Sequence, residues 1–222
     1  MAEKKAALRG MVFAGGEGSR LKRFIQEYFG TDAPKQFCAF VGRRTMIEQA
    51  LRRAETIIPR KRLVVVATAH HRRYVFDAVT ARPPGTILIQ PANRETAPGI
   101  LLPLVRVLHS DPDAVVAILP SDHFVLPGRR FMAAVSEAAA YVSGDGSESV
   151  VLLGVEPTDA ESDYGWVEPR SPAGVRSHLS IRTINRFVEK PSDACARELM
   201  KKGWLWNTMV MVARAIAHEA CP

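Results

Sequence analysis

The 222-residue chain is long enough for one large domain, and its 47% hydrophobic and 24% charged residues exclude a wholly disordered protein. Its apolar runs have the length of strands, and none approaches the ~20 residues that a membrane-spanning helix needs. The short charged N-terminus also lacks the apolar core of a secretory signal. We therefore expect a protein of the cytoplasm with no membrane partner.

The net charge of +7 suits an anionic partner, either a nucleic acid or nucleotide phosphates. The basic residues occur as scattered pairs, without the pattern of an RNA-binding segment or a zinc finger, so a nucleic acid partner is not expected. Cys38, Cys195 and Cys221 are far apart in the sequence. This spacing favours isolated reduced thiols over disulfides or a zinc cluster.

Strand-like apolar runs alternate with amphipathic helical stretches, which predicts an α/β fold with a mostly parallel sheet flanked by helices. The elements expected first, in chain order, are a strand at 10–14, a helix at 45–56, a strand at 63–67, a helix at 71–79, a strand at 86–90, a helix at 97–109, a strand at 114–119, a helix at 131–142 and a strand at 150–155. The pattern then changes to longer strands at 164–168 and 181–189, a loop at 171–174, a helix at 194–202 and a strand at 208–213. One domain with a strand-rich second half is the simplest interpretation.

A glycine-rich turn, GGEGSR at 15–20, follows the first expected strand and precedes a helix. Glycines let the backbone approach an anion, and exposed amides at a helix N-terminus supply positive potential. Arg20 and Lys35 would add charge, the former as a planar fork and the latter as a point charge. The turn has neither the third glycine of the dinucleotide fingerprint nor the Gly-Lys-Ser/Thr of a Walker loop. Taken alone, its glycines are equally compatible with a tight turn that needs them only for its dihedral angles.

Segment 13–21 and the Pro-Lys-Gln of 34–36 together resemble the signature of sugar-nucleotide pyrophosphorylases, which are nucleotidyltransferases. Ser19 replaces the family's usual threonine and keeps the hydroxyl, whereas 22–24 lacks the family's proline. Four further segments match in family order, so the resemblance extends from about Gly10 to the end, and it is greatest to the mannose-1-phosphate guanylyltransferase branch. It implies a Rossmann-like fold of the nucleotide-diphospho-sugar transferase type, with a sugar-binding second half.

The resemblance also implies which residues bind the nucleotide. The glycine-rich turn would contribute Ala14, Gly15, Gly16, Gly18 and Ser19. Segment 90–98 is similar to the base side of the guanylyltransferase branch and would contribute Gln90, Asn93, Arg94 and Thr96. Many members of the family carry Asn where this chain has Glu95, and Thr96 is also suited to capping the next helix.

Asp122 follows the expected central strand, and ligands of open α/β sheets bind outside the carboxyl ends of strands. A lone Asp at such a place is more often a cap or turn residue. The resemblance, however, implies that Asp122 is the ligand of a Mg²⁺ cofactor, since a carboxylate suits this hard cation. Arg20, Lys35 and Asp122 would be the catalytic residues. His123 is expected to be structural, because imidazole is a poor magnesium ligand.

Three later segments resemble the sugar side of the family. Gly165 would let the sugar lie against the backbone, Glu189 would accept hydrogen bonds from its hydroxyls, and Lys190 would neutralise its phosphate. Asn207 would be a further sugar ligand, and Met209 stands where the family has glycine. Without the resemblance, Gly165 is compatible with a strand distortion and the Glu189-Lys190 pair with an exposed strand end.

The resemblance implies that a sugar phosphate oxygen attacks the α-phosphorus of a nucleoside triphosphate, GTP and mannose 1-phosphate being favoured, to give GDP-mannose and pyrophosphate. Both substrates are polyanions, so positioning and charge neutralisation are the main needs. Family members continue and supply a second magnesium-binding Asp, so we expect 1–222 to be a single nucleotidyltransferase domain truncated at its C-terminus. A non-catalytic nucleotide-sugar-binding or regulatory relative, and a pyrophosphorylase for another sugar and nucleotide, remain alternatives. The oligomeric state is open, a homo-oligomer included.

Overall fold

The computed structural model describes residues 6–79, 82–94, 96–170 and 181–215. The chain divides into two compact units. The first consists of Met1–Ser149 and Val212–Pro222, and the second of Val150–Met211. The loop predicted at 171–174 lies outside the described residues.

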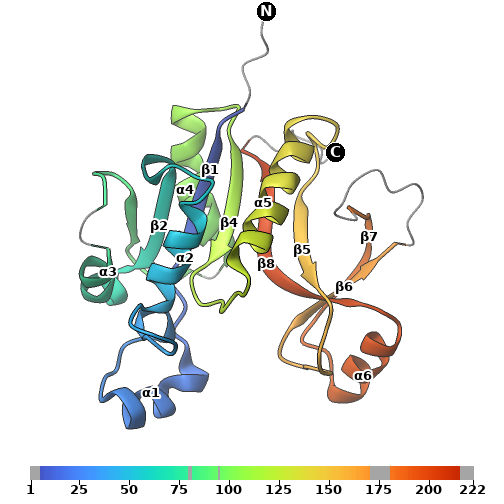
Figure 1. The fold of residues 1–222 in the computed structure, drawn as a ribbon, viewed down its shortest axis with the longest axis horizontal. Helices are drawn as coiled ribbons and strands as arrows, with labels where there is room; N and C mark the ends of the chain where they lie inside the picture. Colours follow the sequence, from blue (N-terminus) through green and yellow to red (C-terminus); the bar gives the residue numbers. More distant parts are fainter. Residues whose placement is uncertain (1–5, 80–81, 95, 171–180, 216–222) are drawn as a thin grey trace, which may run out of the picture. The chain divides into compact units, whose positions relative to one another are not determined.

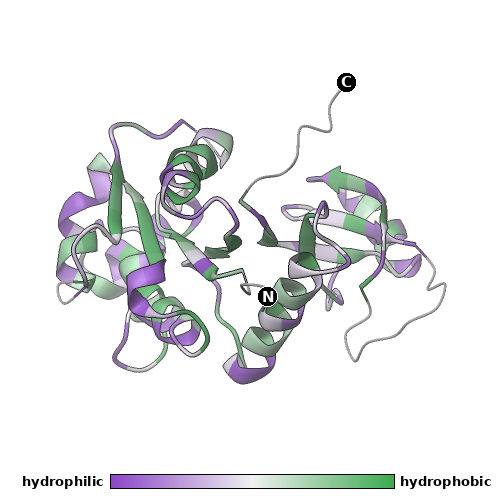
Figure 2. Cartoon of the chain, turned by 90° about the horizontal axis from the view of Figure 1, so that it is seen from above, coloured by the Kyte–Doolittle hydropathy of each residue, from purple (hydrophilic) through white to green (hydrophobic). Residues whose placement is uncertain are grey.

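A parallel sheet forms the centre of the first unit (Figure 1). Its strands are, in spatial order, β3 (Ile87–Gln90), β2 (Leu63–Thr68), β1 (Leu8–Phe13) and β4 (Val115–Pro120). All three neighbouring pairs are parallel. Figure 2 shows these strands mainly in the colour of hydrophobic residues, as expected for a parallel sheet that is covered on both faces.

Helices cover both faces of this sheet, with α2 and α5 on one side and α4 on the other (Figure 1). The helices of the unit are α1 (Lys22–Phe29), α2 (Met46–Ala54), α3 (Arg72–Ala78), α4 (Thr96–Ser110) and α5 (Gly128–Ser143). Short 3-10 helices lie at Ser19–Leu21, Lys35–Phe37, Arg60–Arg62 and Ala69–His71. Met11 and Val116 of the sheet pack with Val107 of α4 in one core cluster. The predicted alternation of strands and helices is therefore confirmed in this unit.

The second unit is built on antiparallel pairing, which agrees with the strand-rich second half predicted from the sequence. It contains β5 (Val151–Val155), β6 (Gly165–Pro169), β7 (Ile184–Glu189), α6 (Asp193–Lys201) and most of β8 (Leu205–Arg214). β6 pairs antiparallel with both β7 and β8. Trp166 and Trp204, almost fully buried, form its core with Ala196 and Leu199 of α6.

The structure also bears on membrane-spanning helices and on the state of the cysteines. Within the described residues, no helix combines the length and the apolar character needed to span a membrane. Cys38 and Cys195 are free thiols, as predicted, and Cys221 lies outside the described residues. Burial raises the pKa of the Cys38 thiol, which makes it a poor nucleophile.

Candidate active site

The glycine-rich turn follows the carboxyl end of β1 and is anchored by one buried side-chain amide. Gln36 is 2% exposed, and its Nε2 donates to the carbonyl oxygens of Ala14 at 3.0 Å and Gly16 at 2.8 Å. The Ala14 amide in turn donates to the Val66 carbonyl of β2 at 2.7 Å. The turn is therefore held in place through its carbonyl groups by protein donors.

Gly18 is the position of this turn that most needs glycine. Its φ of 61° lies in the left-handed region, and a Cβ there would come within 3.1 Å of Lys35 Cγ and 3.3 Å of Lys35 N. At Gly15 a Cβ would lie 3.3 Å from Thr68 Cγ2, whereas at Gly16 it would meet nothing within 4 Å. The absent side chain at Gly18 lets Lys35 pack directly against the turn.

Lys35 reaches Asp122, so two of the three predicted catalytic residues meet. β1 and β4 are neighbours with Phe13 opposite Pro120, and the Ser121 amide donates to the Phe13 carbonyl at 3.1 Å. This register puts the residue after β4 beside the glycine-rich turn after β1. Lys35 Nζ lies 2.9 Å from Asp122 Oδ2, and both side chains are about one third exposed. The sheet order changes direction between β1 and β4, which is where open α/β sheets bind their ligands.

The surroundings of Asp122 fit a magnesium ion whose coordination would be completed by waters and phosphate oxygens. Mg²⁺ keeps several waters and is commonly bound by one or two carboxylates plus phosphate oxygens, and Asp122 offers one partly exposed carboxylate. The described part of the chain contains no group of three His, Cys, Asp or Glu side chains arranged to hold a metal.

His123, next to Asp122, has a structural environment. Burial lowers its pKa, an effect that the Asp122 charge opposes, so we expect a neutral imidazole at pH 7. Its carbonyl accepts a hydrogen bond from Arg53 Nη2 at 3.4 Å. Arg53 also lies over the Phe131 ring, 5.3 Å from the ring centroid, and therefore connects α2 and α5 to the segment that carries Asp122.

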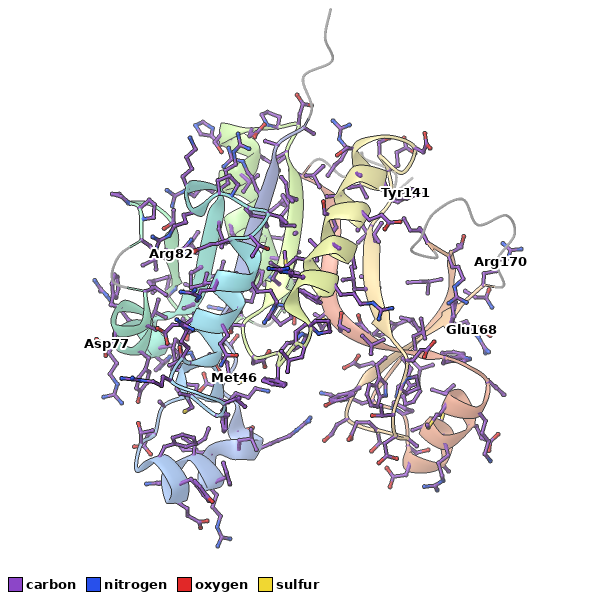
Figure 3. All side chains as sticks on the ribbon, viewed as in Figure 1. Met46, Asp77, Arg82, Tyr141, Glu168 and Arg170 are labelled. Carbon is purple, nitrogen blue, oxygen red and sulfur yellow. The ribbon has the colours of Figure 1, made fainter. Side chains whose placement is uncertain are left out.

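A pocket of about 270 Å³ opens beside the Lys35–Asp122 pair. It is lined by Leu21, Lys35, Phe40, Val41, Met46, Gln49, Asp122, His123 and Phe124. Met46, labelled in Figure 3, begins α2 and contributes to the apolar part of this wall. The pocket thus combines one cation–carboxylate pair with a largely apolar lining, as small-molecule sites commonly do.

The remaining residues predicted to bind the nucleotide lie around the same edge of the sheet. Ser19 and Arg20 are exposed and belong to the 3-10 helix that leads into α1. Gln90 ends β3 and is 8% exposed; its Nε2 donates to the Pro98 carbonyl at 3.4 Å, so this amide hydrogen-bonds the first turn of α4. The other predicted base-side residues are Asn93 and Arg94, which are exposed, and Thr96, which is the first residue of α4.

Sequence reasoning gave no role to two residues that support the turn, Gln36 and His71. In the sequence, Gln36 stands out only as part of the Pro-Lys-Gln motif at 34–36, which gives it no individual role. His71 is 3% exposed; its Nδ1 lies 3.2 Å from Thr68 Oγ1 and its Nε2 lies 3.6 Å from Glu17 Oε2 in the turn. Nothing in the local sequence indicates the contact of His71 with Glu17, because it joins the segments that follow β2 and β1.

In the second unit, Gly165 and Glu189 are opposite each other in the β6–β7 ladder. A Cβ on Gly165 would come within 2.7 Å of Glu189 Oε2 and 2.9 Å of Phe187 Cζ. Because Gly165 has no side chain, the Glu189 carboxylate can lie over β6 at this position. On the other side of β6, Trp166 lies opposite Trp206 of the antiparallel strand β8. The same register, continued by one residue, puts Asn207 beside Gly165. Residues in one such row point to the same face of a sheet, so Glu189 and Asn207 flank Gly165.

Backbone strain occurs at Lys190, a predicted sugar-binding residue, and at Met209, two residues after the predicted sugar ligand Asn207. Lys190 has φ 45° and Met209 has φ 57°, and these are the two non-glycine residues with positive φ in the described ranges. Asn207 Oδ1 accepts a hydrogen bond from the Met209 amide at 3.1 Å. Met209 thus adopts the left-handed conformation that suits the glycine of the family motif. Strained backbone of this kind clusters at functional sites.

The first unit therefore places a glycine-rich turn and a Lys–Asp pair together at the carboxyl ends of parallel strands. The sequence matches the Nucleotidyl transferase family over residues 9–220. The chain belongs to this family.

Individual relatives are similar over nearly the whole chain. The xanthan biosynthesis protein XanB of Xanthomonas campestris is 31% identical over 208 residues, which are 92% of this chain and 42% of that protein. A putative mannose-1-phosphate guanylyltransferase of Vibrio cholerae is 29% identical, with the same two coverages. A crystal structure described as mannose-1-phosphate geranyltransferase from Thermus thermophilus superposes with a TM-score of 0.77 at 29% identity and covers 94% of this chain and 57% of that one. The chain spans about two fifths of the length of these curated relatives.

Proposed function

We propose that this chain is the nucleotide-binding catalytic part of a sugar-1-phosphate nucleotidyltransferase that makes GDP-mannose and pyrophosphate from GTP and mannose 1-phosphate. The observation that supports this most is the 2.9 Å contact of Lys35 with Asp122 beside the glycine-rich turn. A cation, a carboxylate and the backbone amides of a glycine-rich turn in one place are the groups that a bound triphosphate requires.

The residues of the first unit hold and neutralise the triphosphate. Backbone amides of the turn and the Arg20 guanidinium bind the β- and γ-phosphates, which leave as pyrophosphate. The Lys35 ammonium neutralises charge that develops on the phosphates while the sugar phosphate oxygen attacks in line. No covalent intermediate with the protein is needed, because the reaction exchanges one phosphoanhydride partner for another.

Asp122 is the residue that would hold Mg²⁺. The ion, when bound, supplies charge neutralisation to the phosphate oxygens that complete its coordination. Lys35 already pairs with Oδ2 of this carboxylate. Phosphate oxygens would then compete with Asp122 for the Lys35 ammonium.

The residues of the second unit recognise the sugar phosphate. Glu189 and Asn207 hydrogen-bond the hydroxyl groups, the glycine between them leaves the backbone open to the ring, and Lys190 pairs with the phosphate. The preference for mannose and guanine rests on the similarity of segments 90–98 and 119–123 to the guanylyltransferase branch and on the names of the relatives.

Pyrophosphate release tests this proposal. Purified protein is assayed with Mg²⁺, each of four nucleoside triphosphates and several hexose 1-phosphates, and we expect the highest rate with GTP and mannose 1-phosphate. Asp122→Asn should lower that rate by roughly 10²–10³-fold, the effect typical of a lost electrostatic stabiliser. Asp113→Asn is the matched control, since Asp113 lies before the amino end of β4 and is 80% exposed.

Absence of pyrophosphate with every substrate pair would contradict the proposed catalysis. Tight binding of GDP-mannose without turnover would instead identify a nucleotide-sugar-binding relative.

A further inference from the structure

We propose that a second pocket of the first unit, separate from the Lys35–Asp122 site, binds a small phosphate-bearing anion. This pocket has a volume of about 290 Å³, near the low end for small-molecule sites. Four arginines line it: Arg44, Arg52, Arg60 and Arg82. We call it the arginine pocket.

The arginines come from separate parts of the sequence. Arg44 precedes α2, Arg52 lies on α2, Arg60 begins a 3-10 helix, and Arg82 follows α3. In the sequence they appear as scattered basic residues, and the fold gathers them. Segment 41–82 holds ten Lys or Arg and three Asp or Glu, so its net charge of +7 equals that of the entire chain. The positive excess that suits an anionic ligand is therefore concentrated here.

The carboxylates of the arginine pocket are already engaged. Glu48 accepts hydrogen bonds from the Thr45 amide and hydroxyl, both at 2.8 Å, in the capping box of α2. Glu55 accepts from Arg82 Nη1 at 2.7 Å and lies 3.3 Å from Arg60 Nε. Arg52 is one helical turn from both carboxylates, yet neither Arg52 nor Arg44 has a salt-bridge partner among the described residues. Two guanidinium groups thus remain available for a ligand.

The buried side chain of Arg82 forms a wall of the arginine pocket that is held in place by hydrogen bonds. The Arg82 side chain is 2% exposed, and its Nη2 donates to the carbonyls of Arg60 and Leu63 at 3.2 and 3.0 Å (Figure 3). Its Nε is buried and has no hydrogen-bond partner in the described part of the chain. Leu51 and Val79, each 5% exposed, form an apolar floor. Guanidinium groups gathered around such a small floor suit a compact phosphate group better than an extended nucleic acid backbone.

Calorimetric titration with inorganic pyrophosphate tests the arginine pocket. Three variants are compared with the wild type: Arg44→Gln/Arg52→Gln, the control Arg129→Gln/Arg130→Gln, and Lys35→Met. The control removes two arginines from α5 that are also exposed. We expect the first variant to lose one binding event or to weaken it at least tenfold, and the control to change it less than threefold.

The Lys35→Met variant separates this inference from the proposed function. It should retain the binding event that depends on Arg44 and Arg52, even if the Lys35–Asp122 site binds no pyrophosphate at all. Unchanged binding in Arg44→Gln/Arg52→Gln, an equal loss in the control, or complete loss in Lys35→Met would each overturn the inference. Arg82 is left intact, because its replacement would unpair Glu55 inside the fold.

Discussion

At the scale of single residues, Met209 shows how this chain keeps a family conformation with a different side chain. Its φ of 57° is one that L-residues adopt at a cost of roughly 1–2 kcal/mol. The hydrogen bond from its amide to Asn207 Oδ1 holds the conformation in place. The same hydrogen bond orients the side chain of Asn207, which we propose as a sugar ligand.

Substitutions at Met209 should separate backbone strain from side-chain packing. Met209→Gly should be at least as stable as the wild type, since relief of the left-handed strain offsets the entropy of glycine, about 0.5–1 kcal/mol. Met209→Ile should lower the free energy of unfolding by about 1–2 kcal/mol, because a β-branched side chain is poorly tolerated at positive φ. Met211→Ile, on the extended part of β8, is the control and should cost less than ~1 kcal/mol. Urea denaturation measures all three, and equal losses at 209 and 211 would show that strain is not the cause.

At the scale of elements, the turn between β1 and α1 is fixed by contacts with other strands and loops. Gln36 bonds two of its carbonyls, and Lys35 packs against Gly18. The turn is followed by α1, of which only Ile25 is buried. Anchoring therefore comes from the Lys35–Phe37 segment and from β2 rather than from α1.

Two alanine substitutions in this turn should differ in stability. Gly18→Ala should lower the free energy of unfolding by about 1–2 kcal/mol, because it combines a positive φ with a 3.1 Å approach to Lys35 Cγ. Gly16→Ala should change it by less than ~0.5 kcal/mol, since a Cβ there meets nothing within 4 Å and its φ is not in the left-handed region. Chemical denaturation of the two variants is the measurement. A loss at Gly16 as large as that at Gly18 would contradict this description of the turn.

At the scale of the whole molecule, the parallel sheet was predictable because its strands are buried on both faces. Runs such as Val64–Val66 and 114–119 are unbroken apolar stretches, so their assignment depended little on context. The position of Asp122 beside the glycine-rich turn followed from the rule for carboxyl ends of strands together with the family resemblance. The first expectation rests on local sequence pattern, and the second on topology and the family resemblance.

Other features depend on the register between distant segments and could not be predicted. The bond from Gln36 to Gly16, the contact of His71 with Glu17, and the gathering of Arg44 with Arg82 all join segments that are far apart in the sequence. The boundaries of the two compact units at 149/150 and 211/212 were also not evident, because the second falls inside one continuous strand. The expectation of a single truncated domain stays a prediction.

Binding of GTP in the presence of Mg²⁺ to Lys35→Met, with Lys201→Met as control, tests the proposed triphosphate site most directly. Both lysines pair with a carboxylate at 2.9 Å, and such partly exposed pairs contribute only ~0–1 kcal/mol to stability, so neither variant should change the Tm appreciably. We expect Lys35→Met to weaken GTP binding at least tenfold and Lys201→Met to leave it unchanged. Wild-type affinity for GTP in a folded Lys35→Met protein would contradict the assignment of this site.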